Sequence, residues 1–213
     1  MEGYTLAFVF DPYSAWSFAC CGTMRDVVES YSDRLRFQVV PSGLYAGITA
    51  PQQTHELGLV QKREADEVHQ ATGVEFGSAF YHFIATTGGV VDSQIPSSAI
   101  LAVEQVAPLL AVPYLCAVMG ARFTDGLDIG NRDVLKQLAL KLGVNEADYD
   151  RTVSAPITIG NALVDMYDDK TLFSKMPLFY LSDAGNRFVV GERYITYNDL
   201  TRKLERFLDT EEW

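Results

Sequence analysis

The sequence predicts an α/β fold in which a long helical block interrupts a single sheet. Strand-like runs rich in β-branched and aromatic residues occur only near the two ends of the chain. They are Tyr4–Phe10 and Leu35–Val40 at the start, and Leu178–Leu181 and Arg187–Val190 at the end. With 213 residues and 48% hydrophobic content, the chain can bury a full core as one domain that carries a large insertion.

The first part of the chain has the pattern of a β-α-β unit. Asp11-Pro12 ends the first strand, and apolar residues then recur near the helical period from Ala15 to Tyr31. Ser14 precedes this helix and is placed to cap its N-terminus. With the second strand, the unit has the length of a right-handed crossover connection.

The middle of the chain is predicted to be helical throughout, and no linker or repeat separates it from its flanks. The chain then returns to strands, which form a hairpin around a turn at 182–185, and ends in an amphipathic helix, Asn198–Leu208. The helices predicted between the two pairs of strands are Pro51–Ala71, Gly77–Thr86, Ser97–Val106, Leu109–Phe123, Arg132–Leu142, Glu146–Val153 and Ile157–Asp169.

The order β-α-β, helices, β-β-α is that of a thioredoxin-like fold with an all-helical insertion. We expect residues 1–45 and 172–213 to form the discontinuous thioredoxin-like domain, and residues 46–171 to form the insertion domain. Along the chain, the helical block would therefore separate the two pairs of strands that form one sheet.

Charge and cysteine content exclude several classes of function. A formal net charge of −11 and no local cluster of Lys and Arg argue against nucleic acid and anionic membranes as partners. The stretch Met1–Phe10 lacks a basic leader and is too short for a membrane span, so we expect a cytoplasmic protein. Three cysteines without metal-ligand spacing, Cys20, Cys21 and Cys116, are expected to be reduced thiols.

Four segments carry a resemblance to a known family. They are Asp11–Ser17 (DPYSAWS), Val91–Pro96 (VDSQIP), Phe123–Ile129 (FTDGLDI) and Lys175–Phe179 (KMPLF). Taken in this order, they resemble the DsbA-like thioredoxin-fold proteins, a group of protein-disulfide isomerases and FrnE-like oxidoreductases. The resemblance covers nearly the whole chain. It implies that Pro177 is a cis-proline whose loop, with Met176, faces the turn after the first strand.

The resemblance fails at the redox centre. The family's segment reads Asp-Pro-x-Cys-Gly-Trp-Cys, and here Ser14 and Ser17 replace the two cysteines. Thiol–disulfide exchange needs a thiolate that attacks and a sulfur that leaves, and a hydroxyl provides neither. Cys20 and Cys21 lie well inside the predicted helix, where we expect buried structural thiols. Ser14 could serve as an N-cap alone, or as an N-cap that also contacts a ligand.

Three functions remain open on the sequence alone. The leading one is a DsbA-family protein without dithiol chemistry that binds a thiol-bearing or peptide ligand in a groove between Ser14 and Pro177. The residues expected to line that groove are Asp11, Tyr13, Trp16, Met176 and Pro177.

The second function is a glutathione-dependent transferase or isomerase. It comes from a more distant resemblance to kappa-class glutathione transferases and hydroxychromene-carboxylate isomerases, in which a Ser-Pro-Tyr-Ser segment replaces the cysteine pair. The resemblance implies that Ser14 stabilises the thiolate of glutathione, the only cofactor we consider. Here Pro12-Tyr13 precede the serine instead of following it. The third function is a catalytically silent adaptor for a protein partner, and a homodimer stays open as well.

Other candidate sites are weaker. No metal site is expected, because the histidines lack ligand spacing; they are His55, His69 and His82. A short acidic run is expected to be a solvated helix face; it consists of Glu64, Asp66 and Glu67.

Overall fold

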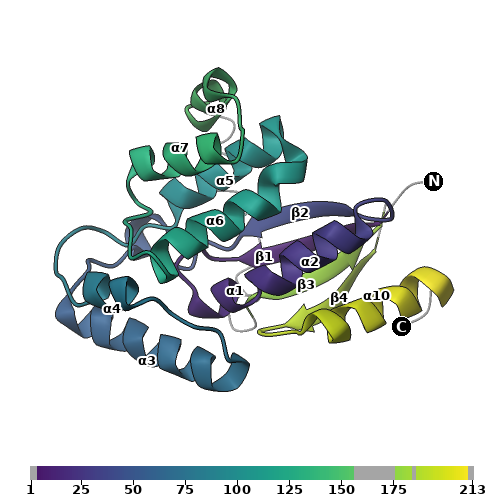
Figure 1. The fold of residues 1–213 in the computed structure, drawn as a ribbon, viewed down its shortest axis with the longest axis horizontal. Helices are drawn as coiled ribbons and strands as arrows, with labels where there is room; N and C mark the ends of the chain where they lie inside the picture. Colours follow the sequence, from purple (N-terminus) through teal and green to yellow (C-terminus); the bar gives the residue numbers. More distant parts are fainter. Residues whose placement is uncertain (1–3, 156–175, 184–185, 211–213) are drawn as a thin grey trace.

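The computed structural model describes residues 4–155, 176–183 and 186–210, and a four-stranded sheet lies at its centre (Figure 1). The strand order is β2-β1-β3-β4, with β1 parallel to β2, β3 antiparallel to β1, and β4 antiparallel to β3. All four predicted strands are confirmed, with ends that differ by at most two residues. Their bounds are β1 Thr5–Phe10, β2 Arg36–Pro41, β3 Leu178–Ser182 and β4 Arg187–Glu192.

The strand β1 is buried on both faces, which explains its almost continuous apolar sequence. Leu6, Phe8 and Phe10 are fully buried in the main core on the side of the helices α2 and α10. Ala7 and Val9 point to the other face, where they pack with residues around β3. A strand in this central position holds the turn that follows it, and that turn carries the two serines.

The helix after β1 differs from the prediction. One continuous helix over Ala15–Tyr31 was wrong, because the chain forms α1 (Ala15–Ala19) and α2 (Cys21–Tyr31) with a break at Cys20. The Cys20 amide donates to the Ser17 carbonyl three residues back, which is a tighter turn than an α-helix makes. α2 then runs along the sheet beside the C-terminal helix α10 (Tyr197–Thr210) (Figure 1).

The insertion is helical over its described part, as predicted, and most helix ends agree closely with the sequence pattern. The largest difference is the start of α3, at His55 instead of Pro51, because Thr54 caps it and accepts a hydrogen bond from the Leu57 amide. The predicted helix Ile157–Asp169 lies outside the described residues. The helices are α3 His55–Thr72, α4 Ser78–Ile84, α5 Gln94–Val106, α6 Ala111–Phe123, α7 Arg132–Lys141 and α8 Glu146–Val153, with 3₁₀ turns at Gly47–Thr49 and Pro108–Leu110.

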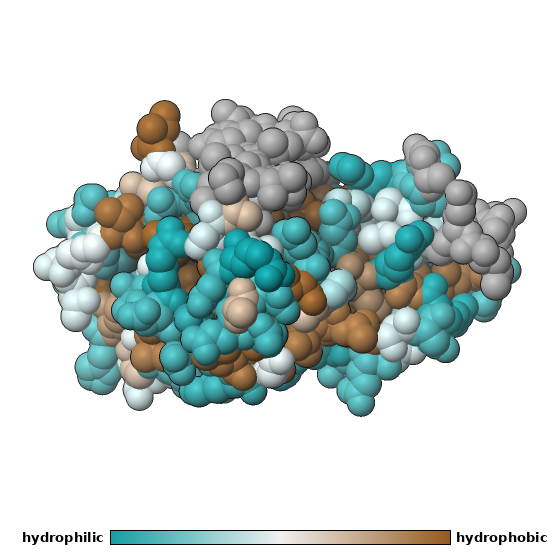
Figure 2. Space-filling model, turned by 90° about the horizontal axis from the view of Figure 1, so that it is seen from above, coloured by the Kyte–Doolittle hydropathy of each residue, from teal (hydrophilic) through white to brown (hydrophobic). Residues whose placement is uncertain are grey.

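The insertion packs on the thioredoxin-like part at two places that position the site. α3 and α6 both contact α1, and α5 and α6 contact β2. On the face drawn in Figure 2, hydrophilic side chains predominate and hydrophobic ones form small separate groups. None of the helices in the described part of the chain combines the length and hydrophobicity of a membrane-spanning segment. The division into domains at residues 45/46 and 171/172 stays a prediction.

Candidate functional site

Ser14 and Ser17 together build the turn between β1 and α1. The Ser14 side chain caps α1, because its Oγ accepts a hydrogen bond of 3.3 Å from the Ser17 amide. The Ser17 Oγ in turn accepts a hydrogen bond of 3.2 Å from the Asp11 amide. Ser14 is 5% exposed and Ser17 is fully buried. The predicted N-cap is confirmed, and of the two serines only Ser14 retains contact with solvent.

Asp11 is a buried carboxylate that ties this turn to two loops. Its Oδ1 accepts a hydrogen bond from the Tyr13 amide (2.9 Å), and its Oδ2 accepts one from the Leu44 amide (2.8 Å). The Ser93 hydroxyl also donates to the carboxylate. Burial raises the pKa of Asp11, and these hydrogen bonds partly oppose that effect. Asp11 is fully buried, so its contacts are with the protein itself.

Tyr13 also packs inward, against a buried arginine of the insertion. The Arg122 guanidinium carbon lies 4.5 Å from the centre of the Tyr13 ring, and Arg122 is only 1% exposed. Burial lowers the pKa of Arg122, and nearby acidic groups such as Asp128 and Asp11 oppose that effect. Rings of Phe80 and other aromatic residues surround the same cation. A cation–π arrangement of this kind stabilises a desolvated guanidinium.

Arg193 connects the proline loop to α1. The Met176–Pro177 peptide bond is cis, as the resemblance implies. The Arg193 amide donates to the Pro177 carbonyl (2.7 Å), and the Arg193 carbonyl accepts a hydrogen bond from the Cys20 thiol (3.3 Å). The exposed guanidinium lies 5.3 Å above the half-buried Trp16 ring. Arg193 thus brings the proline loop and the first turn of α1 to one place.

The backbone at Arg193 is unusual. Arg193 has φ +57°, the only positive φ among the described non-glycine residues. A left-handed conformation at a side-chain-bearing residue costs about 1 kcal/mol or more and persists where the surroundings enforce it. The two backbone hydrogen bonds to the proline loop and to Cys20 provide that enforcement here.

Glu64 on α3 is a further candidate site residue, which the sequence did not reveal. It belongs to α3, which contacts α1, and the Ala15 amide lowers the pKa of its carboxyl group. Burial raises the pKa of Glu64 to about 7, and the negative charge of Asp11 raises it further, while Arg193 lowers it. The prediction of a solvated acidic face was therefore wrong for Glu64, because α3 packs on α1. It was correct for Glu67, which is exposed.

The cysteines are placed as structural thiols, as predicted. Cys20 is fully buried, and burial raises the pKa of its thiol to about 12. Cys21 is 5% exposed, and a hydrogen bond with Cys116, followed by burial, raises its thiol pKa as well. A thiol that resists ionisation in this way is a poor nucleophile.

The predicted site residues thus fall into two groups. Trp16 and Pro177 contact Arg193, and Ser14 caps the first turn of α1. Asp11 and Tyr13 are buried and make their contacts within the protein. The Met176 side chain is 7% exposed and packs on the other face of the sheet. That the Met176 backbone lies within reach of Ser14 stays a prediction.

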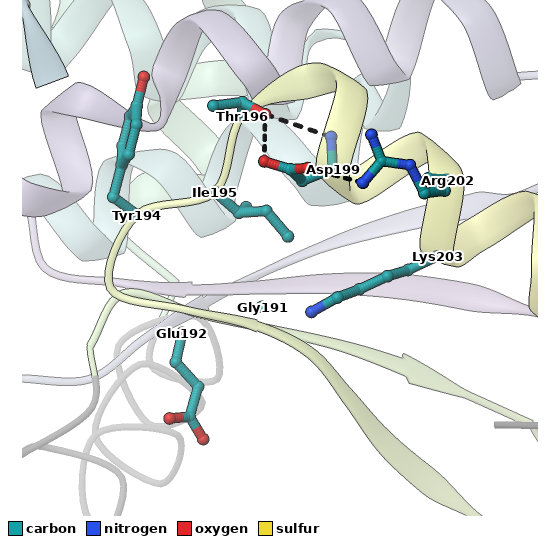
Figure 3. A pocket seen from close by; sticks show the side chains of 8 residues that line it. All are labelled: Gly191, Glu192, Tyr194, Ile195, Thr196, Asp199, Arg202 and Lys203. Carbon is teal, nitrogen blue, oxygen red and sulfur yellow. Dashed lines mark hydrogen bonds and ion pairs between the residues drawn. The ribbon is translucent and has the colours of Figure 1, made fainter.

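A separate cavity of about 480 Å³ lies between the end of β4 and α10. Figure 3 shows Arg202 and Lys203 on α10 and Glu192 across from them at the end of β4. Lys203 donates to the Val190 carbonyl, and Arg202 pairs with Asp199. Since both cations already have partners within the protein, we place the candidate site at Ser14.

The serine pair leads to an expected result for disulfide chemistry. The chain should not reduce insulin above the uncatalysed rate, because neither serine can form a mixed disulfide. The double variant Ser14→Cys with Ser17→Cys should gain a reducible pair, since both side chains belong to one helical turn, and Ser14→Cys alone should not. Wild-type turnover that Cys20→Ser or Cys21→Ser abolishes would place the redox centre elsewhere.

No family model matches the chain, and no curated protein sequence matches it. Solved structures do match. A proposed protein disulfide isomerase from Nitrosomonas europaea has a TM-score of 0.86 at 19% identity, with 99% of this chain and 100% of that chain covered. The cytosolic disulfide reductase DsbM from Pseudomonas aeruginosa has a TM-score of 0.79 at 22% identity, with 96% and 98% covered.

A structure of DsbM from P. aeruginosa with GSH also matches, with a TM-score of 0.75 at 21% identity and 96% and 99% of the two chains covered. At these identities the likeness concerns the fold, and it extends over nearly the full length of both chains. The chain therefore has the DsbA-like thioredoxin fold with a helical insertion.

Proposed function

We propose that this chain binds a thiol-bearing ligand beside Ser14, Trp16 and Pro177 and performs no dithiol exchange there. The observation that carries the proposal is the hydrogen bonding of Ser14. Its Oγ accepts from the Ser17 amide, which leaves the hydroxyl proton available for a ligand atom. A thiolate sulfur at this position would receive a charge-assisted hydrogen bond.

A positive group beside the site supports a ligand that carries a carboxylate. The guanidinium of Arg193 is exposed, and no carboxylate oxygen of the described residues lies within ion-pair distance of it. The stacking on Trp16 orders the side chain before a ligand arrives, which lowers the entropy cost of binding. In a chain with a net charge of −11, such a local cation is what an anionic ligand needs.

Glutathione meets both requirements, since it carries a thiol and two carboxylates. The DsbM structure with GSH has the same fold, which supports glutathione as the first ligand to test. A short cysteine-containing peptide has the same chemistry. The neighbour is called cytosolic, which supports the cytoplasm as the compartment in this proposal. A glutathione-dependent transferase or isomerase is the enzymatic form of the proposal, and it requires that the bound thiol ionise.

Titration of glutathione by calorimetry tests the proposal. We expect saturable binding to the wild type, and about tenfold to hundredfold weaker binding to Ser14→Ala, because a hydrogen bond to a charged group contributes about 1.5 to 3 kcal/mol. Asn145→Ala is the matched control, since it removes the cap of α8 away from the site. That variant should lose a similar amount of stability and keep its affinity.

Two outcomes would contradict the proposal. Absence of saturable binding at millimolar glutathione would favour the adaptor function, in which the partner is another protein or a second copy of the chain. Equal affinity of Ser14→Ala and wild type would show that Ser14 is only a helix cap.

A further inference from the structure

Cys20 connects the break between α1 and α2 to the segment that follows β4. Its thiol donates to the Arg193 carbonyl at 3.3 Å, although the two residues are 173 positions apart in the sequence. Cys20 is fully buried, and the helix breaks at this residue. The contact therefore depends on the tertiary fold and is not a local feature of the helix.

The two backbone hydrogen bonds of Arg193 fix the chain on both sides of its Cα atom. The amide, which belongs to the preceding peptide unit, donates to the Pro177 carbonyl at 2.7 Å. The carbonyl, which belongs to the following peptide unit, accepts from the Cys20 thiol. Because φ and ψ are the only soft torsions between two planar peptide units, fixing both units determines the conformation between them. Arg193 is held at φ +57° in this way.

The left-handed conformation of Arg193 needs such support. For a residue that carries a side chain, this conformation is unfavourable by an amount similar to the net contribution of one hydrogen bond. Loss of the bond from Cys20 would therefore shift the equilibrium between the left-handed and the ordinary conformations of Arg193. The shift would move the guanidinium, which lies 5.3 Å from the centre of the Trp16 ring.

We propose that Cys20 is a positioning residue of the ligand site: its thiol keeps Arg193 left-handed and so holds the guanidinium over Trp16, where a ligand carboxylate can reach it. The part of this inference that concerns a ligand rests on the proposed function. The protonation of the thiol agrees with the role, because burial raises its pKa to about 12 and a thiol donates only while it is protonated. Cys20 acts on the ligand through Arg193 and does not contact it.

Three variants separate the hydrogen bond from the other effects of a substitution. Cys20→Ala removes the donor, whereas Cys20→Ser keeps a donor on a side chain of similar size. Thr23→Val is the matched control, since Thr23 on α2 is also buried and donates to the carbonyl of Ile195 at 3.0 Å. If Cys20→Ala does not fold, Cys20→Val takes its place, because it fills more of the volume and has no donor.

The first measurement needs no ligand. In a Trp213→Phe background Trp16 is the only tryptophan of the chain, so acrylamide quenching of its fluorescence reports how far the guanidinium covers its ring. Arg193→Ala gives the value for the uncovered ring. Cys20→Ala should move at least halfway from the wild-type value towards that of Arg193→Ala, whereas Cys20→Ser and Thr23→Val should stay near the wild type.

The second measurement is calorimetric titration with glutathione and with its diethyl ester, which has no free carboxylate. Cys20→Ala should bind glutathione about threefold to tenfold more weakly, as expected for the loss of one hydrogen bond. It should bind the ester with the wild-type affinity. Cys20→Ser and Thr23→Val should bind both ligands as the wild type does. A cysteine that only filled space would lower stability without this difference between the two ligands.

Four results overturn the inference. Unchanged quenching in Cys20→Ala would show that Arg193 keeps its conformation without the thiol. The same shift in Cys20→Ser would show that the donor is not responsible, and the same shift in Thr23→Val would show that any bond from α2 to this segment has the effect. An equal loss of affinity for the ester and for glutathione also contradicts it. If the wild type binds neither ligand, the proposed function fails, and the quenching data still decide whether Cys20 positions Arg193.

Discussion

Asp11→Ala should destabilise the protein by about 3 to 5 kcal/mol, a large part of the stability of a typical domain. The substitution removes the acceptor for the Tyr13 and Leu44 amides and for the Ser93 hydroxyl. Each buried polar group left without a partner costs about 1 to 3 kcal/mol. Part of that loss is offset, because burial disfavours the ionised carboxylate and the variant no longer buries it. The raised pKa of Asp11 reflects this cost of burial. The change also removes one of the acidic groups that act on the buried Arg122, while Asp128 remains.

Urea unfolding measures this loss as a lower free energy of unfolding, and the m-value of the variant should equal that of the wild type. Asp11→Asn keeps one acceptor oxygen and should lose about half as much, so it remains informative if Asp11→Ala does not fold. The control is Asp125→Ala, an exposed aspartate just after α6, which should stay within about 0.5 kcal/mol of wild type. A loss below about 1 kcal/mol for Asp11→Ala would show that the hydrogen bonds around this carboxylate contribute little.

The regular elements of the fold could be predicted because their signals are local. The run from Tyr4 to Phe10 is apolar enough to mark a central strand, and Ser14 caps the helix where the periodicity begins. The break at Cys20 could not be predicted, because the periodicity of the apolar residues continues across it. The Cys20 thiol donates to the carbonyl of Arg193, a residue far away in the sequence.

The sequence predicted the Ser14 cap and the cis bond before Pro177, which the structure confirms, but it did not predict the charged groups near them. Glu64 lies within a charged run of α3, and only the packing of α3 against α1 separates it from Glu67. Arg122 stands in the last turn of α6, where a basic residue ordinarily caps the helix in solvent. Arg193 follows a strand without any motif, and its role depends on a positive φ and on the ring of Trp16. Such placements depend on tertiary contacts, which a single sequence does not display.

Glu64 should make the stability of the protein depend on pH near neutrality. Burial, and then the negative charge of Asp11, raises its pKa from the ordinary value of 4.5 to about 7. The folded state therefore holds the proton more tightly than the unfolded state. The sign follows from this difference: the contribution of Glu64 to stability is fully present below about pH 4.5 and is lost as the pH rises through about 7.

Between about pH 5.5 and pH 8, wild type should lose about 2 kcal/mol relative to Glu64→Gln, since each pKa unit corresponds to about 1.4 kcal/mol and the loss ends near the folded-state pKa. Urea unfolding of wild type and Glu64→Gln across this pH range gives the difference between their free energies of unfolding. Groups that titrate in the same way in both proteins make no contribution to this difference. Glu67→Gln should show no such pH-dependent difference, since Glu67 is exposed on the same helix. A difference between wild type and Glu64→Gln that stays constant with pH would mean that Glu64 titrates in the folded protein as it does in the unfolded chain. Its carboxylate would then be solvated, and the packing of α3 on α1 would not desolvate the first turn beside Ser14.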